Sequence, residues 1–316
     1  MSRKRALRGV LTLVVLLVVG YFFARGLAEN WSAVREIEIQ VNGWSVGAVV
    51  LFSAAVVVSG LLWGHMLGRL NHSRITRTDA IRVQCLSWLL KYVPGQVGSV
   101  ANKVVWVGDR GISRTLVVIT FVYENVFLLL GSIVPTGVIL LVSRATPGGS
   151  GDLVTTLLPA IAALVPLLLV MDRRIFRGGV NLVARRALRR DVPDEYFLRP
   201  LDALGYQLAF LVPRVLNGIG FVFIVASFLD VSSSAYLPLA AAYVLAGAVG
   251  ILAVFVPSGL GVRESVIVLF ASHYMPIEQA IVLSLLARLY STVGDAVLAL
   301  LYGALKLRDV SEGRQS

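Results

Sequence analysis

The sequence contains few of the residues that build catalytic or metal centres. Its single cysteine, Cys85, excludes an internal disulfide, and its three histidines have no spacing with Cys, Asp or Glu that suggests a metal site. A Walker loop, a dinucleotide fingerprint and a nucleophile elbow are all missing. We therefore expect no cofactor and no metal, no ATP-driven transport by this chain alone, and no enzymatic activity.

Charge is also scarce, since only 15% of the 316 residues are charged and 57% are hydrophobic. A soluble domain usually has about a quarter charged residues. Several apolar runs reach the roughly 20 residues that a membrane-spanning helix needs, and none alternates with period two as a barrel strand would. The sequence therefore predicts an all-α integral membrane protein. Because the net charge of +11 is concentrated beside the apolar runs, it indicates anionic lipids, not nucleic acid, as the partner.

The apolar runs predict seven to eight transmembrane helices in a single membrane domain, residues 1–316. The runs cover about 10–24, 44–67, 115–142, 153–171, 201–229, 236–256 and 279–305. The first follows a basic N-terminus and has no convincing cleavage site, so we expect an uncleaved span, with a cleaved signal peptide as the alternative.

Three features inside and between these runs carry local predictions. The second run has Gly60, Gly64 and Gly68 at four-residue spacing, which predicts close approach of another helix. Pro213 predicts a kink near the middle of the run 201–229. The arginine-rich loop 172–200 is expected to form an amphipathic helix on the membrane surface or, alternatively, a solvated linker.

Two Pro-Gly segments interrupt the hydrophobic pattern. If the first, within 83–107, crossed the bilayer completely, the loop 172–200 with its eight arginines and four acidic residues would lie outside, against the positive-inside rule. A re-entrant helix pair that turns at Pro94 and Gly95 puts the N-terminus and the basic loops in the cytoplasm instead. The sequence thus predicts a multi-pass protein of the plasma membrane with a cytoplasmic N-terminus.

The two interrupted segments also suggest an internal repeat. "PGQVG" ends at Gly98 and "PSGLG" runs from Pro257 through Gly259 to Gly261, and each precedes a run with a charge near its middle. The predicted halves are about 44–171 and 201–305, joined by the basic cytoplasmic loop 172–200, and chance similarity is the alternative. Paired interruptions of this kind indicate a transporter binding site near the midplane, with the Pro-Gly elements as hinges.

Charged residues inside apolar runs are costly and usually face a cavity or a partner. The candidates are Lys91, Lys103, Glu124, Arg214, Arg263, Glu264, Arg288 and Asp295. Arg263 follows the second Pro-Gly segment, where a helix N-terminus favours an anion. We therefore expect a phosphate there, with its charge matched by Lys91 or Arg288. Arg288 and Asp295 are seven residues apart and are expected to clamp a third group. Internal salt bridges that hold the fold together are the alternative for any single pair.

Three segments resemble the signatures of a known family. "KYVPGQVGSVANKVV", "GISRTLVVITFVYENV" and "VPSGLGVRES" are similar to those of the lysylphosphatidylglycerol synthase transmembrane-region family, over nearly the whole chain. The resemblance singles out Lys91, Tyr92, Pro94, Gly95, Pro257, Gly259, Gly261, Arg263 and Glu264. The stretch Gln96 to Ser99 departs from the bulkier, aromatic-containing segment that relatives often have.

In multidomain relatives this region is the flippase half, which moves aminoacylated phosphatidylglycerol between leaflets, and other relatives accompany glycosyltransferases that act on polyprenyl-phosphate lipids. We expect a stand-alone membrane member without the soluble synthase domain. The predicted function is a lipid translocase for an anionic phospholipid or a polyprenyl-phosphate-linked lipid, with Tyr92 among the substrate-binding residues. The alternatives are an intramembrane lipid-modifying transferase with Glu124 or Glu264 as base, and a non-catalytic membrane partner of a glycosyltransferase or synthase.

Overall fold

The computed structural model describes residues 41–92, 97–108, 110–144, 172–188, 192–253, 256 and 259–311, without the side chains of 92, 140–144, 183–188 and 309–311. The predicted runs 10–24 and 153–171, the side chain of Tyr92 and the residues Pro94, Gly95 and Pro257 lie outside what is described. Within the described ranges every regular element is a helix, which confirms the all-α prediction. The elements are α3 (Gly43–Leu70), α4 (Arg77–Leu89), η1 (Leu90–Tyr92), α5 (Val97–Trp106), α6 (Arg114–Arg144), α8 (Arg173–Leu188), η3 (Asp194–Tyr196), α9 (Pro200–Ala209), α10 (Leu211–Phe228), η4 (Ser233–Ala235), α11 (Tyr236–Leu252), α12 (Val262–Ala271) and α13 (Ile277–Ser311).

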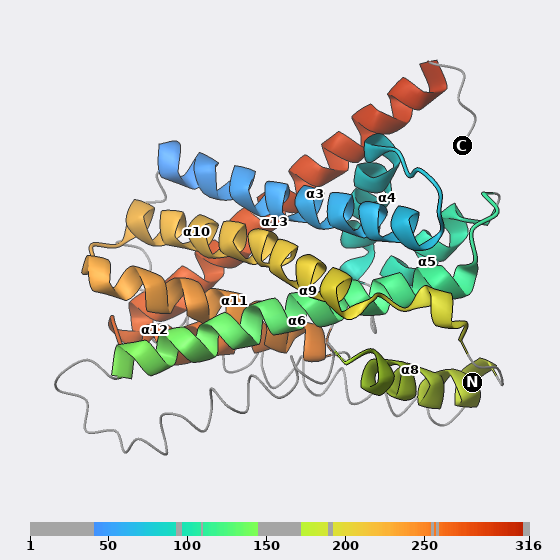
Figure 1. Cartoon of the computed structure of the whole chain (residues 1–316). Coiled ribbons are helices and arrows are strands. Elements are labelled where there is room, and N and C mark those ends of the chain that lie inside the picture. The colour runs from blue at the N-terminus through green and yellow to red at the C-terminus, as the bar shows by residue number, and fades with distance from the viewer. Residues whose placement is uncertain are drawn as a thin grey trace, which may run out of the picture.

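Five helical stretches among the described residues are long and apolar enough to cross a membrane. They are Gly43–Leu70, Arg114–Ile139, Asp194–Phe228, Ser233–Leu252 and Ile277–Arg308. Each contains most of one predicted run, so the protein is a multi-pass membrane protein. In Figure 1, α3, α10, α11 and α6 lie side by side in that order, and α13 crosses behind them.

A break in the helix of residues 200–228 falls where a kink was predicted. α9 ends at Ala209, Phe210 forms a turn, and α10 begins at Leu211. Pro213 has no N–H to donate to the carbonyl of Ala209 four residues earlier, so the helical hydrogen-bond ladder cannot continue unbroken through this point. The break precedes Arg214, one of the candidate site residues.

The glycine ridge of α3 packs against α4, as its spacing predicted. A Cβ atom added at Gly60 would lie 2.5 Å from the Cβ of Gln84, and one added at Gly64 would lie 2.5 Å from the Cβ of Ala80. These separations are well below ordinary carbon contact distances of about 3.5–4.0 Å. The two helices therefore approach this closely only because both ridge positions lack a side chain.

The helices α4 and α5 form an antiparallel hairpin around the first Pro-Gly segment. The side-chain amide of Asn102 donates to the carbonyl of Val83 (3.1 Å) and to the hydroxyl of Ser87 (2.9 Å), while Ser99 donates to the Ser87 carbonyl (2.6 Å). Val107, just after α5, is buried in the same hydrophobic cluster as Leu67 near the end of α3. The residue after α5 and the end of α3, which precedes α4 in the chain, therefore belong to one hydrophobic cluster.

The second Pro-Gly segment lies between α11 and α12 in the chain. α12 packs against both α11 and α13. Gly259 and Gly261 both have positive φ angles, 63° and 78°, a conformation that side chains other than glycine rarely adopt. A Cβ atom at Gly259 would also lie 2.8 Å from the Cα of Gly250 on α11. The backbone here thus requires glycine for its conformation and for its close approach to α11. Gly98, the remaining predicted hinge residue, lies in the first turn of α5.

The basic loop 172–200 contains the helix α8, as predicted. Phe176 and Asn181 are buried on one side of it, whereas Ile175 and Leu182 are exposed. The side-chain oxygen of Asn181 accepts from the N–H of Val192 (3.0 Å), which fixes α8 to the segment that leads into α9. The helix therefore has one face against the bundle and another, with apolar residues and arginines, that is exposed among the described residues.

Candidate functional site

A cavity of about 170 Å³ lies among α3, α4, η1, α5, α6, α10, α11, α12 and α13. Of the charged candidates, Lys91, Lys103, Glu124, Arg214, Arg263 and Asp295 line it. Glu264 and Arg288 line a smaller adjoining pocket that shares Tyr243, Arg263 and Ser291 with the cavity. The structure thus brings all eight charged candidates to one region, although they come from six different elements.

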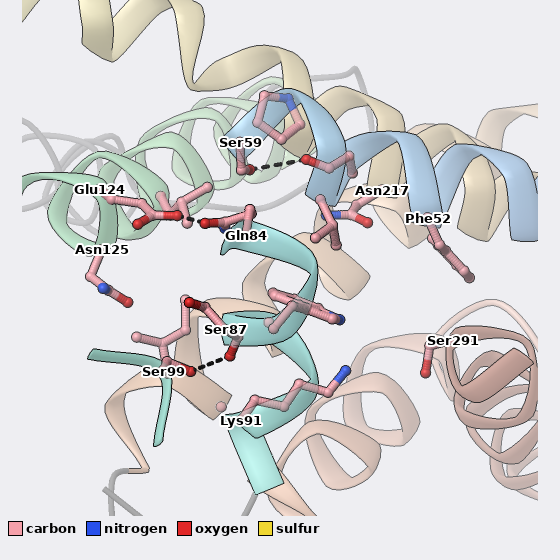
Figure 2. Close-up of a pocket in the computed structure, with 18 of the residues that line it drawn as sticks. Phe52, Ser59, Gln84, Ser87, Lys91, Ser99, Glu124, Asn125, Asn217 and Ser291 are labelled. Atoms are coloured by element: carbon pink, nitrogen blue, oxygen red, sulfur yellow. Dashed lines mark hydrogen bonds between the residues drawn. The ribbon is translucent and has the colours of Figure 1, made fainter. Parts of the chain in front are cut away.

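One ion pair connects the first hairpin to α6. Lys103 on α5 and Glu124 on α6 bond directly, and their exposed fractions are only 1% and 3%. The amide nitrogen of Gln84 on α4 donates to the other oxygen of the same carboxylate at 2.8 Å, as Figure 2 shows. The ammonium of Lys103 also lies 4.2 Å from the ring centroid of Trp63. Glu124 therefore binds α4 and α5 to α6 at the cavity wall.

A second ion pair connects η1 to α13. The ammonium of Lys91 lies 2.8 Å from each carboxylate oxygen of Asp295. The indole N–H of Trp88 donates to the same carboxylate at 2.8 Å, and Lys91 stacks over the Trp88 ring at 4.3 Å. This group joins the first interrupted segment to the last helix of the chain.

The third ion pair lies at the start of α12. The carboxylate of Glu264 accepts a hydrogen bond from the N–H of Gly261 (2.6 Å) and lies 3.4 Å from the guanidinium of Arg288. This helix N-terminus was predicted to favour an anion, and in the structure that anion is the chain's own carboxylate. Arg288 and Asp295, expected to clamp one group between them, instead face Glu264 and Lys91 respectively.

Two arginines of the cavity have no acidic partner among the described residues. Arg214 donates from its Nε to the carbonyl of Leu128 (3.0 Å), but its Nη2 is buried and has no hydrogen-bond partner. The guanidinium carbon of Arg263 lies 5.5 Å from the ring centroid of Tyr243. Since the three acidic residues are each paired with another cation, Arg214 and Arg263 leave the region with excess positive charge.

Sequence reasoning missed the uncharged polar residues of the cavity. Gln84, Ser87 and Asn217, labelled in Figure 2, line the same cavity as Lys91 and Glu124. A signal for part of this set was present, because Gln84 lies seven residues before Lys91 and so shares a helix face with it. The hydroxyl and amide groups add neutral donors and acceptors to the charged wall.

Comparison with known proteins identifies the family of this chain. No curated protein matches the chain. The model of the family described as "Lysylphosphatidylglycerol synthase TM region" matches residues 9–299. This range includes both Pro-Gly segments and every charged residue of the cavity. The chain therefore belongs to the lysylphosphatidylglycerol synthase TM region family.

Proposed function

We propose that the protein is a lipid translocase that moves an anionic phospholipid or a polyprenyl-phosphate-linked lipid between leaflets. Membership of the family implies a function connected with membrane lipids. The observation that carries the proposal is the convergence of charged side chains from six elements on one cavity inside a multi-pass bundle. A charged side chain within the bilayer costs roughly 2.5–3.5 kcal/mol on insertion scales. A set of charged side chains this large is therefore expected where the side chains meet a polar ligand.

The geometry of the interrupted segments supports two re-entrant elements. At 1.5 Å per residue, α4 is about 20 Å long and α5 and α12 are each about 15 Å long, whereas the hydrocarbon core is about 30 Å thick. None of the three spans the core alone. Five described spans together with the apolar runs 10–24 and 153–171 would then make seven membrane crossings.

The packing of the helices supports the proposed duplication. α3 packs on α4 as α10 packs on α11, and α4 packs on α5 and α13 as α11 packs on α12 and α6. The pairs α5–α6 and α12–α13 also correspond, and each is joined by one ion pair, Lys103 with Glu124 and Glu264 with Arg288. The cavity lies between the two corresponding sets, where relative motion of the halves would open it alternately to each leaflet.

Translocation is tested with purified protein in liposomes that contain fluorescent phosphatidylglycerol, by adding a membrane-impermeant quencher. We expect probe from the inner leaflet to move to the outer leaflet, where the quencher acts on it, only in protein-containing vesicles. Arg263→Ala should slow this phase about tenfold or more, because a hydrogen bond to a charged group is worth about 1.5–3 kcal/mol.

Arg110→Ala is the matched control, since Arg110 is exposed and stacks on Trp106 outside the cavity. Quenching equal to that of protein-free vesicles would refute the translocase. A new covalent lipid product would identify a transferase instead. A partner that only anchors a glycosyltransferase would support that enzyme's reaction while Arg263→Ala changed nothing.

The topology makes a separate prediction. Arg77, at the start of α4, and Arg174, in α8, are both exposed and should lie on the cytoplasmic side, because both basic segments follow the positive-inside rule if the hairpin is re-entrant. Single cysteines at these positions, in a chain with the buried Cys85 replaced, should react with an impermeant thiol reagent only from that side. Labelling from opposite sides would exclude the re-entrant hairpin.

A further inference from the structure

We infer that Arg214 and Arg263 together form one site for the phosphate group of a lipid head group. The inference rests on the proposed function, because it names the part of the substrate that the translocation cavity holds. It assigns the anion to the two unpaired arginines, whereas Lys91 and Arg288 serve as partners of Asp295 and Glu264.

The two arginines lie on the same face of α11. A Cβ atom at Gly247 would lie 3.5 Å from Nη1 of Arg214, and one at Gly250 would lie 2.8 Å from Cγ of Arg263. Residues three apart on a helix are surface neighbours, with Cβ positions about 5–6 Å apart. Two glycines one turn apart therefore give both side chains a path across the helix, and Tyr243, one turn earlier, supports the guanidinium of Arg263.

The electrostatics of the pair call for an anion. Arg214 has an exposed fraction of only 9%, lines the cavity and has a buried Nη2 with no acceptor. Like charges close together in a medium of low dielectric destabilise each other, and the acidic residues that line the cavity are bound to other cations. An anion between the two guanidinium groups would supply both the missing acceptor and the missing charge.

Phosphate fits this arrangement better than other lipid groups. Guanidinium groups present planar forks of donors that match phosphate oxygens in pairs. The two negative charges of a phosphate monoester balance the two positive charges of the arginines. A phosphodiester, with one negative charge, balances only half of that positive charge, and a zwitterionic head group offers no net charge. Asn217, three residues after Arg214 on α10, lines the same cavity as a further donor. We therefore expect the order phosphatidate, phosphatidylglycerol, phosphatidylcholine.

The test measures binding independently of transport. Purified protein in neutral detergent is mixed with each of these three lipids or with inorganic phosphate, and the shift in melting temperature gives the affinity. Wild-type protein should be stabilised in the stated order, and inorganic phosphate should have little effect. In Arg214→Gln and Arg263→Gln the affinity for phosphatidate should fall about tenfold or more, whereas in the exposed variant Arg110→Gln it should not change.

A second pair of variants keeps every charge and so does not depend on how a buried arginine replacement folds. Gly250→Ala pushes the aliphatic part of Arg263 away from α11, whereas Gly303→Ala on α13 meets nothing within 4 Å. Only Gly250→Ala should weaken stabilisation by phosphatidate.

Equal stabilisation by all three lipids, or an unchanged shift in the arginine and Gly250 variants, would overturn the site. A shift from inorganic phosphate as large as that from phosphatidate would overturn its assignment to a lipid. Lipid binding as expected without translocation in vesicles would leave this site standing and would refute the proposed function alone.

Discussion

Replacing Lys103 by methionine should destabilise the protein by about 3–5 kcal/mol, because it leaves the carboxylate of Glu124 charged, buried and without its cation. Neither solvent nor lipid can take the place of the ammonium at a site where both side chains are almost fully covered. Gln84 keeps its hydrogen bond to Glu124 but brings no charge. The free energy of unfolding, measured by denaturation in mixed micelles, should show the loss.

The double variant Lys103→Met with Glu124→Gln should recover most of this stability. It removes both charges, and the new amide at position 124 can donate to the oxygen of Gln84, which is buried without a partner. The control is Arg177→Met, since Arg177 and Asp194 form an exposed ion pair with side chains 44% and 60% accessible. Such pairs contribute about 0–1 kcal/mol. A loss for Lys103→Met no larger than for Arg177→Met would show that the buried pair does not stabilise the fold.

The local features of the fold were predictable because each follows from a short-range rule. Pro213 indicated a break in its run, and the break at Phe210 lies where the missing N–H requires it. The four-residue glycine spacing of α3 indicated the close helix contact that Gly60 and Gly64 make. The length of α13 was not predictable in the same way. It continues beyond the apolar run to Ser311, because hydrophobicity marks the membrane-spanning part of a helix and not its end.

The gathering of the charged residues was also predictable, but their pairing was not. A charge in an apolar run needs a polar environment wherever it lies, so convergence on a cavity follows from cost alone. Which cation meets which acid depends on how distant helices face each other, as Lys91 and Asp295 do across 204 positions of sequence. For this reason the sequence suggested Lys91 or Arg288 as companions of Arg263, whereas the geometry leaves Arg214 in that role.

The second large effect is expected at the glycine ridge of α3. Gly64→Ala places a methyl carbon 2.5 Å from the Cβ of Ala80, so α3 and α4 must separate. Overpacking of this kind typically costs about 1–3 kcal/mol. Because α4 also carries Gln84, its displacement should disturb the contact with Glu124 and slow lipid translocation as well. Unfolding free energy and the liposome quenching rate measure the two effects.

A compensating substitution separates the close contact from any general intolerance of alanine. Ala80→Gly removes the carbon that Gly64→Ala would strike, so the double variant should regain the helix separation, apart from the roughly 0.5–1 kcal/mol that glycine costs inside a helix. Gly205→Ala in α9 is the control, because its methyl group meets nothing within 4 Å and should be neutral or slightly stabilising. If Gly64→Ala matches Gly205→Ala in stability and rate, then the distance between α3 and α4 does not set the position of the cavity wall. If the double variant restores transport together with stability, the glycine ridge positions Gln84 and through it the charged wall that receives the lipid.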